Sequence, residues 1–87
     1  MRLAKFVKFR EEKFGGVLFE TRSEKVFTLN PTAAAVVREI AAGRDEGEIA
    51  LHLKEAFDDP AGSLEREVAW LVADLRAKGL VEDSPHG

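Results

Sequence analysis

The chain has 87 residues, of which 45% are hydrophobic and 33% are charged, and it contains no cysteine. This composition and length predict one globular domain over residues 1–87. It excludes disulfides, cysteine metal sites and thiolate catalysis, and it is typical of a protein of the reducing cytoplasm. The N-terminal segment MRLAKFVKFR lacks the apolar run of a signal peptide or a membrane span, so no membrane association is expected.

The net charge of −3 is unevenly distributed along the chain. Residues 1–25 contain seven Lys or Arg and four Glu, a balance of +3, whereas residues 26–87 contain six Lys or Arg and twelve Asp or Glu, a balance of −6. Two interpretations stay open: ordinary solvated surfaces, or a mildly basic N-terminal region that steers an acidic partner. Duplex nucleic acid usually requires a more basic surface, so it is not expected as a partner.

The first third of the chain has the composition of β-strands. Aromatic, aliphatic and β-branched residues predict strands over Lys5–Arg10, Val17–Thr21 and Lys25–Leu29. Glu11–Gly16 is predicted to be a loop in which two glycines supply unusual backbone angles, and Arg22–Glu24 a short connection. Short connections favour an antiparallel meander. Because the strands are apolar on both faces and helices would cover only one, the other face is left for loops, the N-terminal segment, a second copy of the chain in a homodimer, or a partner.

A strand passes directly into a helix at Asn30-Pro31. Asn30 is a favourable N-cap and Pro31 fits the first helical position, where its missing N–H costs nothing. A helix is therefore predicted from Pro31 to about Ala42, before the helix stop at Gly43. Its expected buried stripe is Ala34, Val37, Ile40 and Ala41.

Two more helices are predicted in the second half of the chain. Asp45 and Glu48 have capping-box spacing at the start of the second helix. Its apolar positions are Ile49, Leu51, Leu53, Ala56 and Phe57. The loop Asp58–Gly62 follows.

The third helix is predicted to be capped by Ser63 and to stop at Gly79. Its core stripe is Leu64, Val68, Leu71, Val72 and Leu75. Leu80-Val81 is expected to return as an apolar tail, and residues 82–87 to be frayed.

Trp70 falls outside the apolar stripe of the third helix, about 120° from its centre. Two interpretations stay open. The indole packs on the sheet edge or a loop, or it forms a flat contact surface together with the small side chains of Ala73 and Ala77.

The residues that could carry chemistry are scattered. His52 lies in the second helix without a second His or Cys nearby, and His86 lies in the terminal tail, whereas a metal site needs several ligands. The adjacent carboxylates Glu11-Glu12 and Asp58-Asp59 fall in loops and do not converge as a catalytic pair does. Gly15-Gly16 lacks the spacing of a phosphate-binding loop. We therefore expect no enzyme activity, no cofactor and no metal.

The order of elements in FREEKFGGVLFETRSEKVFTLNPTAAAVVREIAAGRDEGEI…LKEAF…VAWLVADLRAKGLV resembles the PqqD-like family. These proteins are RiPP recognition elements, the peptide-recognition domains of ribosomal peptide maturation. The resemblance rests on three elements: the junction Leu29-Asn30-x-Thr32-Ala33-Ala34, the helix stop Gly43-Arg44, and the closing Leu75-x-x-x-Gly79-Leu80-Val81. It covers about residues 5–82.

The resemblance implies an α+β fold in which a three-stranded antiparallel sheet is followed by three helices, similar to a winged helix-turn-helix. It implies that a precursor leader peptide adds as a strand beside the third strand, in a groove against the third helix. The chain would be a chaperone without turnover that delivers the precursor to a radical SAM or cyclase-type enzyme. Mapped onto this sequence, the peptide-binding residues are Lys25, Val26, Phe27, Thr28, Leu29, Leu71, Val72, Leu75, Arg76 and Lys78.

Two rival hypotheses come from other classes of protein. A winged-helix DNA-binding regulator would read DNA with the third helix, but Arg66, Arg76 and Lys78 there are matched by Glu65, Glu67 and Asp74, whereas phosphate binding favours clustered cations. A structural or dimerisation module is the other alternative.

Overall fold

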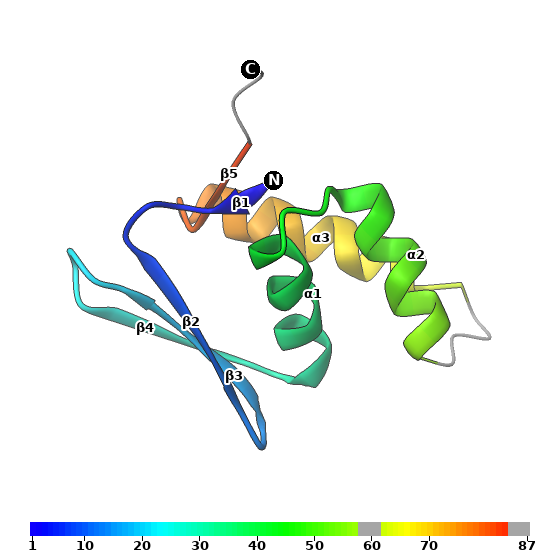
Figure 1. The fold of residues 1–87 in the computed structure, drawn as a ribbon, viewed down its shortest axis with the longest axis horizontal. Helices are drawn as coiled ribbons and strands as arrows, with labels where there is room; N and C mark the ends of the chain where they lie inside the picture. Colours follow the sequence, from blue (N-terminus) through cyan, green and yellow to red (C-terminus); the bar gives the residue numbers. More distant parts are fainter. Residues whose placement is uncertain (58–61, 84–87) are drawn as a thin grey trace.

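The structure is a computed structural model, and it describes residues 1–57 and 62–83. A three-stranded antiparallel sheet lies beside three helices, in a molecule of about 40 × 35 × 20 Å (Figure 1). The sheet has the order β2-β3-β4 and consists of β2 (Val7–Glu12), β3 (Gly15–Glu20) and β4 (Lys25–Leu29). The predicted meander, the α+β fold class and the third strand are thus confirmed, while the likeness to a winged helix-turn-helix is loose.

The first two strands differ from the prediction at their ends. β2 begins at Val7 and continues to Glu12, and β3 begins at Gly15, so the predicted loop Glu11–Gly16 is a two-residue turn. The glycines permit this extension of the hairpin. A Cβ on Gly16 would lie 2.7 Å from Cε1 of Phe9, and Gly15, at φ +140°, passes so close to the β4–α1 junction that a Cβ there would lie 2.1 Å from the carbonyl oxygen of Leu29. Of the two, only Gly15 has the positive φ that the sequence suggested.

The helix α1 (Pro31–Ala41) begins as predicted. Pro31 is its first residue, and the N-cap Asn30 accepts a hydrogen bond through Oδ1 from the backbone N–H of Ala33 at 2.8 Å. Ala34, Val37 and Ile40 are buried, but Ala41 is exposed, because the buried side of the helix turns toward Ala33, Ala35 and Val36 instead.

The helix α2 (Glu46–Ala56) has the predicted capping box of Asp45 and Glu48. Two of its five expected apolar positions, Ile49 and Leu53, are buried. Leu51, Ala56 and Phe57 are exposed, since α2 packs through a single narrow side against α1 and α3. Most of the predicted Asp58–Gly62 loop lies outside the described residues.

The helix α3 (Leu64–Ala77) buries Leu64, Val68, Val72 and Leu75 in the core, and Leu71 is half-buried. Ser63 occupies the N-cap position, but its side chain makes no capping hydrogen bond and its backbone is helical, so the predicted cap is wrong. Gly79, at φ +73°, follows the end of the helix as expected.

The two ends of the described chain meet in a pairing that the sequence analysis missed. β1 (Arg2–Leu3) pairs antiparallel with β5 (Val81–Glu82) (Figure 1). Arg2 Nε lies 2.8 Å from Glu82 Oε1. Glu82 is therefore in a strand and not frayed, while residues 84–87, which include His86, lie outside the described residues. The neighbouring Leu80 and Val81 are buried in the core.

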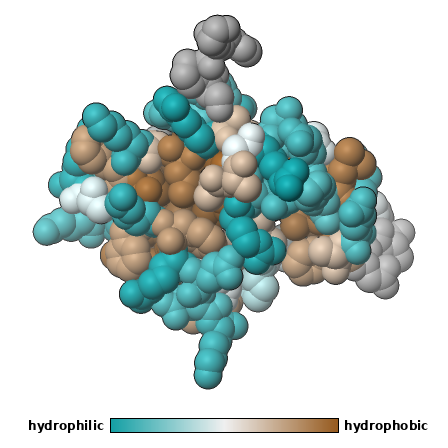
Figure 2. Space-filling view, in the orientation of Figure 1, coloured by the Kyte–Doolittle hydropathy of each residue, from teal (hydrophilic) through white to brown (hydrophobic). Residues whose placement is uncertain are grey.

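The core fills the space between one face of the sheet and the helices. Leu18 and Leu29 belong to it, and Phe9 and Phe27 pack against it. Hydrophobic side chains gather in the middle of the view in Figure 2, between the sheet and the helices, with hydrophilic side chains around them. No described helix has the length and apolarity needed to cross a bilayer.

Candidate functional site

The strand β4 forms one edge of the sheet, and its backbone exposes hydrogen-bonding groups there. The N–H of Thr21 donates to the carbonyl oxygen of Phe6 at 2.9 Å, which makes residues 6 and 21 a hydrogen-bonded pair between β2 and β3. Backbone direction alternates along a strand, so the even-numbered residues of β3 bond to β4. Their partners in the register are Lys25, Phe27 and Leu29. The N–H and C=O groups of Val26 and Thr28 consequently point away from β3, toward the open edge.

The opposite edge, β2, is less suited to receive another strand. Four of its six residues are charged, whereas only Lys25 is charged among the five residues of β4. Charged side chains on an edge strand discourage pairing with a further chain. The β4 edge is therefore the better acceptor of an added strand.

A hollow of about 220 Å³, here named the β4–α3 groove, lies between this edge and α3. Its lining residues are Phe27, Thr28, Leu29, Asn30, Ala33, Leu71, Asp74, Leu75, Lys78 and Leu80. The groove has an apolar floor and one ion pair on its wall, because Lys78 Nζ lies 2.6 Å from Asp74 Oδ2.

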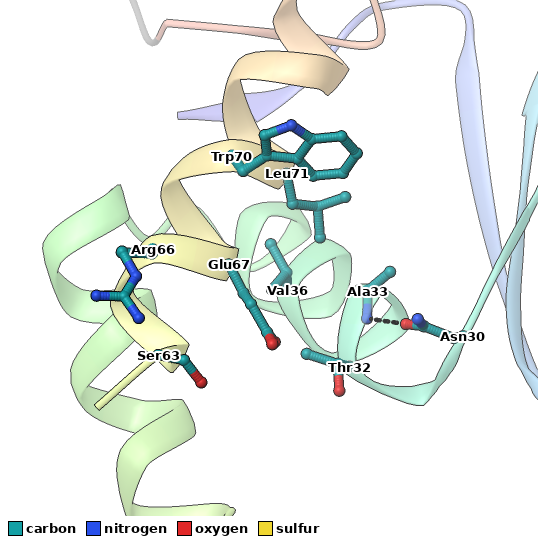
Figure 3. A pocket seen from close by; sticks show the side chains of 9 residues that line it. All are labelled: Asn30, Thr32, Ala33, Val36, Ser63, Arg66, Glu67, Trp70 and Leu71. Carbon is teal, nitrogen blue, oxygen red and sulfur yellow. Dashed lines mark hydrogen bonds between the residues drawn. The ribbon is translucent and has the colours of Figure 1, made fainter. Parts of the chain in front are cut away.

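A larger cavity of about 530 Å³, here named the Trp70 cavity, adjoins the groove. It is lined by Asn30, Thr32, Ala33, Val36, Ser63, Arg66, Glu67, Trp70 and Leu71. The two hollows share Asn30, Ala33 and Leu71, so they form one continuous depression along α3. Figure 3 shows Leu71 projecting from α3 toward the start of α1, with the indole of Trp70 beside it and Arg66 pointing away.

The indole of Trp70 is 69% exposed. This exposure disfavours the interpretation in which the indole packs on the sheet edge or a loop, and the contact-surface interpretation stays a prediction. A half-buried Leu71 and an exposed Trp70 at the mouth of one cavity form an amphipathic contact area of the kind that binds peptides.

The structure brings six of the ten predicted site residues together around the β4–α3 groove: Phe27, Thr28, Leu29, Leu71, Leu75 and Lys78. The other four lie elsewhere. The side chain of Val26 is on the far face of the sheet, Lys25 borders a different hollow, Val72 is fully buried behind the groove, and Arg76 binds Asp83 at 2.6 Å.

Sequence reasoning missed Asn30, Ala33, Asp74 and Leu80 as lining residues. Asp74 carries a recognisable signal, since it precedes Lys78 by four residues, the spacing of a helical ion pair. The others are placed by the turn from β4 into α1 and by the return of the chain after α3, and no local pattern marks them.

The hairpin between β3 and β4 is organised around Glu20. Its carboxylate accepts hydrogen bonds from Ser23 Oγ at 2.5 Å, from the backbone N–H of Ser23 at 2.8 Å and from the backbone N–H of Arg22 at 3.2 Å. The Ser23 side chain is the largest cause, and together with the backbone donors it lowers the pKa of Glu20 to about 2. The hydrogen bonds to the ionised Glu20 carboxylate therefore stabilise the turn that precedes β4.

The described side chains that could carry chemistry are dispersed. Within residues 1–57 and 62–83, no cluster of three or more His, Asp or Glu could hold a metal ion. His52 Nδ1 lies 2.7 Å from Glu39 Oε1, which also lies 3.4 Å from Arg44 Nε, so His52 is part of a polar contact between α1 and α2.

The fold that places the β4 edge beside α3 can be compared with known proteins. A family model described as "Coenzyme PQQ synthesis protein D (PqqD)" matches residues 15–81. The chain therefore belongs to the PqqD family.

Two solved structures have the same fold. One is titled "Lasso peptide synthetase B1 complexed with the leader peptide"; it is 29% identical, the match covers 91% of this chain and 93% of that one, and the TM-score is 0.77. The other, "TbiB1 in Complex with the TbiA(beta) Leader Peptide", is 17% identical over 99% of this chain and 100% of that one, with a TM-score of 0.85, and at this identity it shows the fold alone. A search of curated proteins gave no match.

Proposed function

We propose that this chain binds the leader segment of a ribosomally synthesised precursor peptide and presents it to a modifying enzyme, without turnover of its own. The leader adds as a strand to β4 and lies in the β4–α3 groove. The observation that carries the proposal is the open edge of Val26 and Thr28 directly beside that groove. Backbone pairing supplies affinity that tolerates sequence variation, and the pockets select alternate side chains.

Membership of the PqqD family and the leader-bound structural neighbour at 29% identity support the peptide as the partner. The proposed partner enzyme is a radical SAM maturase or a cyclase-type enzyme. The relative at 29% identity is named as part of a peptide synthetase, which is compatible with the second type.

The sharpest test is a calorimetric titration of the purified chain with the leader of a short precursor encoded beside its gene. We expect saturable binding with a one-to-one ratio. A scrambled leader of the same composition serves as the control, because it keeps charge and hydrophobicity but changes which side chains face the groove. If the leader and the scrambled peptide bind equally, or neither binds, the proposal is wrong.

A further inference from the structure

One face of the three-stranded sheet points away from the helices and is here named the outer sheet face. The register places two cross-strand rows on it, Lys8–Phe19–Val26 and Arg10–Val17–Thr28. None of its apolar side chains belongs to the core cluster, which takes Leu18 and Leu29 from the opposite face. Val26 is 56% exposed. Phe19 is half-buried and Val17 on the same face is only 7% exposed, so Val26 and part of Phe19 are the apolar side chains that this face offers to a partner.

Cations lie over the aromatic rings at this face and beside it. The guanidinium of Arg10 is 5.7 Å from the ring centre of Phe19. Next to the hairpin, Arg22 and Lys5 lie 4.5 Å and 5.6 Å from the ring centre of Phe6, which is 38% exposed. Rings and cations held together in this way present an apolar surface with positive charge at its rim.

The positive charge is only partly neutralised. Arg10 pairs with Glu12, and Arg22 pairs with Glu20. Among the residues that the structure describes, Lys5 and Lys8 have no carboxylate within ion-pair distance. Lys8 borders a hollow of about 350 Å³ together with Phe19. Of the two carboxylates at that hollow, Glu20 is occupied by Ser23 and Arg22, which leaves Glu24 as the opposing charge.

We propose that the outer sheet face is a docking surface for an acidic segment of a partner protein, with apolar side chains over Phe19 and Val26 and carboxylates beside Lys5 and Lys8. The distribution of charge on the outer sheet face decides between the possible binding partners. A second copy would bring the same cations face to face if it docked through this surface. Nucleic acid is disfavoured because Glu12, Glu20 and Glu24 interrupt the basic surface, whereas phosphate backbones favour uninterrupted cations.

The outer sheet face adjoins the β4 edge, to which the leader is proposed to bind. The identity of the protein that docks on this face rests on that proposed function. Side chains of β4 alternate, so Val26 and Thr28 belong to the outer sheet face while Phe27 and Leu29 point to the other side. A partner docked here leaves the β4–α3 groove open for a leader. A leader strand added to the β4 edge would extend the outer sheet face by its own alternate side chains. The partner is thus the modifying enzyme, which contacts the chaperone and the bound leader on one surface.

The test uses the full ¹⁵N-labelled chain and a short capped peptide of alternating Glu and Leu residues. We expect its titration to shift the amide signals of Lys8, Phe19 and Val26, with weaker binding at high salt because screening shortens the attraction. Lys5→Glu combined with Lys8→Glu should weaken binding at least tenfold. The single variant Lys8→Glu has Lys13→Glu as its matched control, since this makes the same change of charge at the opposite end of the hairpin, and Lys13→Glu should change the affinity less than twofold.

Each alternative gives a different result. Amide shifts confined to the β4–α3 groove, or equal binding of a peptide of alternating Lys and Leu, would overturn the proposal. Tighter binding of a single-stranded oligonucleotide at the same amides would identify a nucleic-acid surface instead. The single variant Lys8→Ala removes one positive charge without adding a negative one, and it should also weaken binding. It therefore tests the proposal even if the double variant does not fold. The titration contains no leader, so a failure of leader binding would overturn the proposed function and leave this result standing.

Discussion

Lys78 Nζ lies 2.6 Å from Asp74 Oδ2, one helical turn earlier on α3, and both side chains line the β4–α3 groove. The groove wall therefore carries a balanced pair and not a free cation. Arg76, two residues before Lys78, binds Asp83 at 2.6 Å and lies outside the groove. The two cations that the sequence suggested for reading the leader thus have different environments, and they can be tested separately.

The first prediction concerns the charge of the groove wall. Lys78→Glu places a second carboxylate beside Asp74, so the groove becomes negative and repels any leader that places acidic side chains beside α3. We expect slower association at low salt in stopped-flow mixing, with the loss shrinking at high salt. Arg76→Glu makes the same charge change outside the groove and should leave the association rate close to that of the unmodified chain. Equal slowing by both variants would assign the effect to the general charge of α3.

The second prediction concerns the strand edge. Thr28→Pro removes an N–H that points to the open edge, so the pairing of β4 with β3 is kept while an added strand loses a hydrogen-bond donor. Leader affinity should fall at least tenfold, about 1.4 kcal/mol. Circular dichroism should show a folded protein. Thr28→Val is the control, because it changes the side chain and keeps the N–H. A folded proline variant that binds leader normally would remove the β4 edge from the site.

The third prediction uses the single tryptophan of the chain. Trp70 borders the cavity that continues the β4–α3 groove, and it is 69% exposed. A leader that runs from the groove into the Trp70 cavity covers the indole, so its fluorescence emission should move to shorter wavelength on titration. Trp70→Ala removes no core packing, and we expect its free energy of unfolding to change by less than about 0.5 kcal/mol. An unchanged emission spectrum at saturating leader would mean that the leader ends before this cavity.

The parts of the fold that the sequence predicted have local causes. Asn30 and Pro31 set the start of α1, and Asp45 with Glu48 sets the start of α2, because caps act within one turn of the chain. Pairings between distant segments were missed. Arg2 pairs with Glu82 across almost the whole chain, and no local pattern records it.

The same difference between local features and contacts of distant segments applies to the candidate site. The strand β4 was predicted from its own residues, whereas its role as the peptide-binding edge was implied only by the family resemblance. The exposure of Leu51 and Trp70 and the lining of the groove by Asn30 and Leu80 depend on how helices and strands are placed against each other. A helical wheel gives the apolar side of one helix, but it does not say how much of that side a neighbour covers.

The last prediction concerns the pH dependence of folding at the hairpin that begins β4. The hydroxyl of Ser23, followed by its backbone N–H, lowers the pKa of Glu20 from 4.5 to about 2, since these donors favour the carboxylate over the acid. A group whose pKa is lower in the folded state stabilises the fold above its unfolded pKa, and the stabilisation is lost as the pH falls through the folded value. The Glu20 carboxylate should therefore stabilise the fold fully above about pH 4.5, and this stabilisation should be lost between pH 4.5 and about pH 2.

Urea unfolding of the unmodified chain and of Glu20→Gln over this range should give a difference in the free energy of unfolding that shrinks with falling pH. Glu24→Gln makes the same change in the same turn, where the described residues show no hydrogen bond to the Glu24 carboxylate, and it is the control for losing a carboxylate without losing the hydrogen bonds at Ser23. If the Glu20→Gln difference stays constant over this pH range, the hydrogen bonds at Ser23 do not stabilise the charged hairpin in solution.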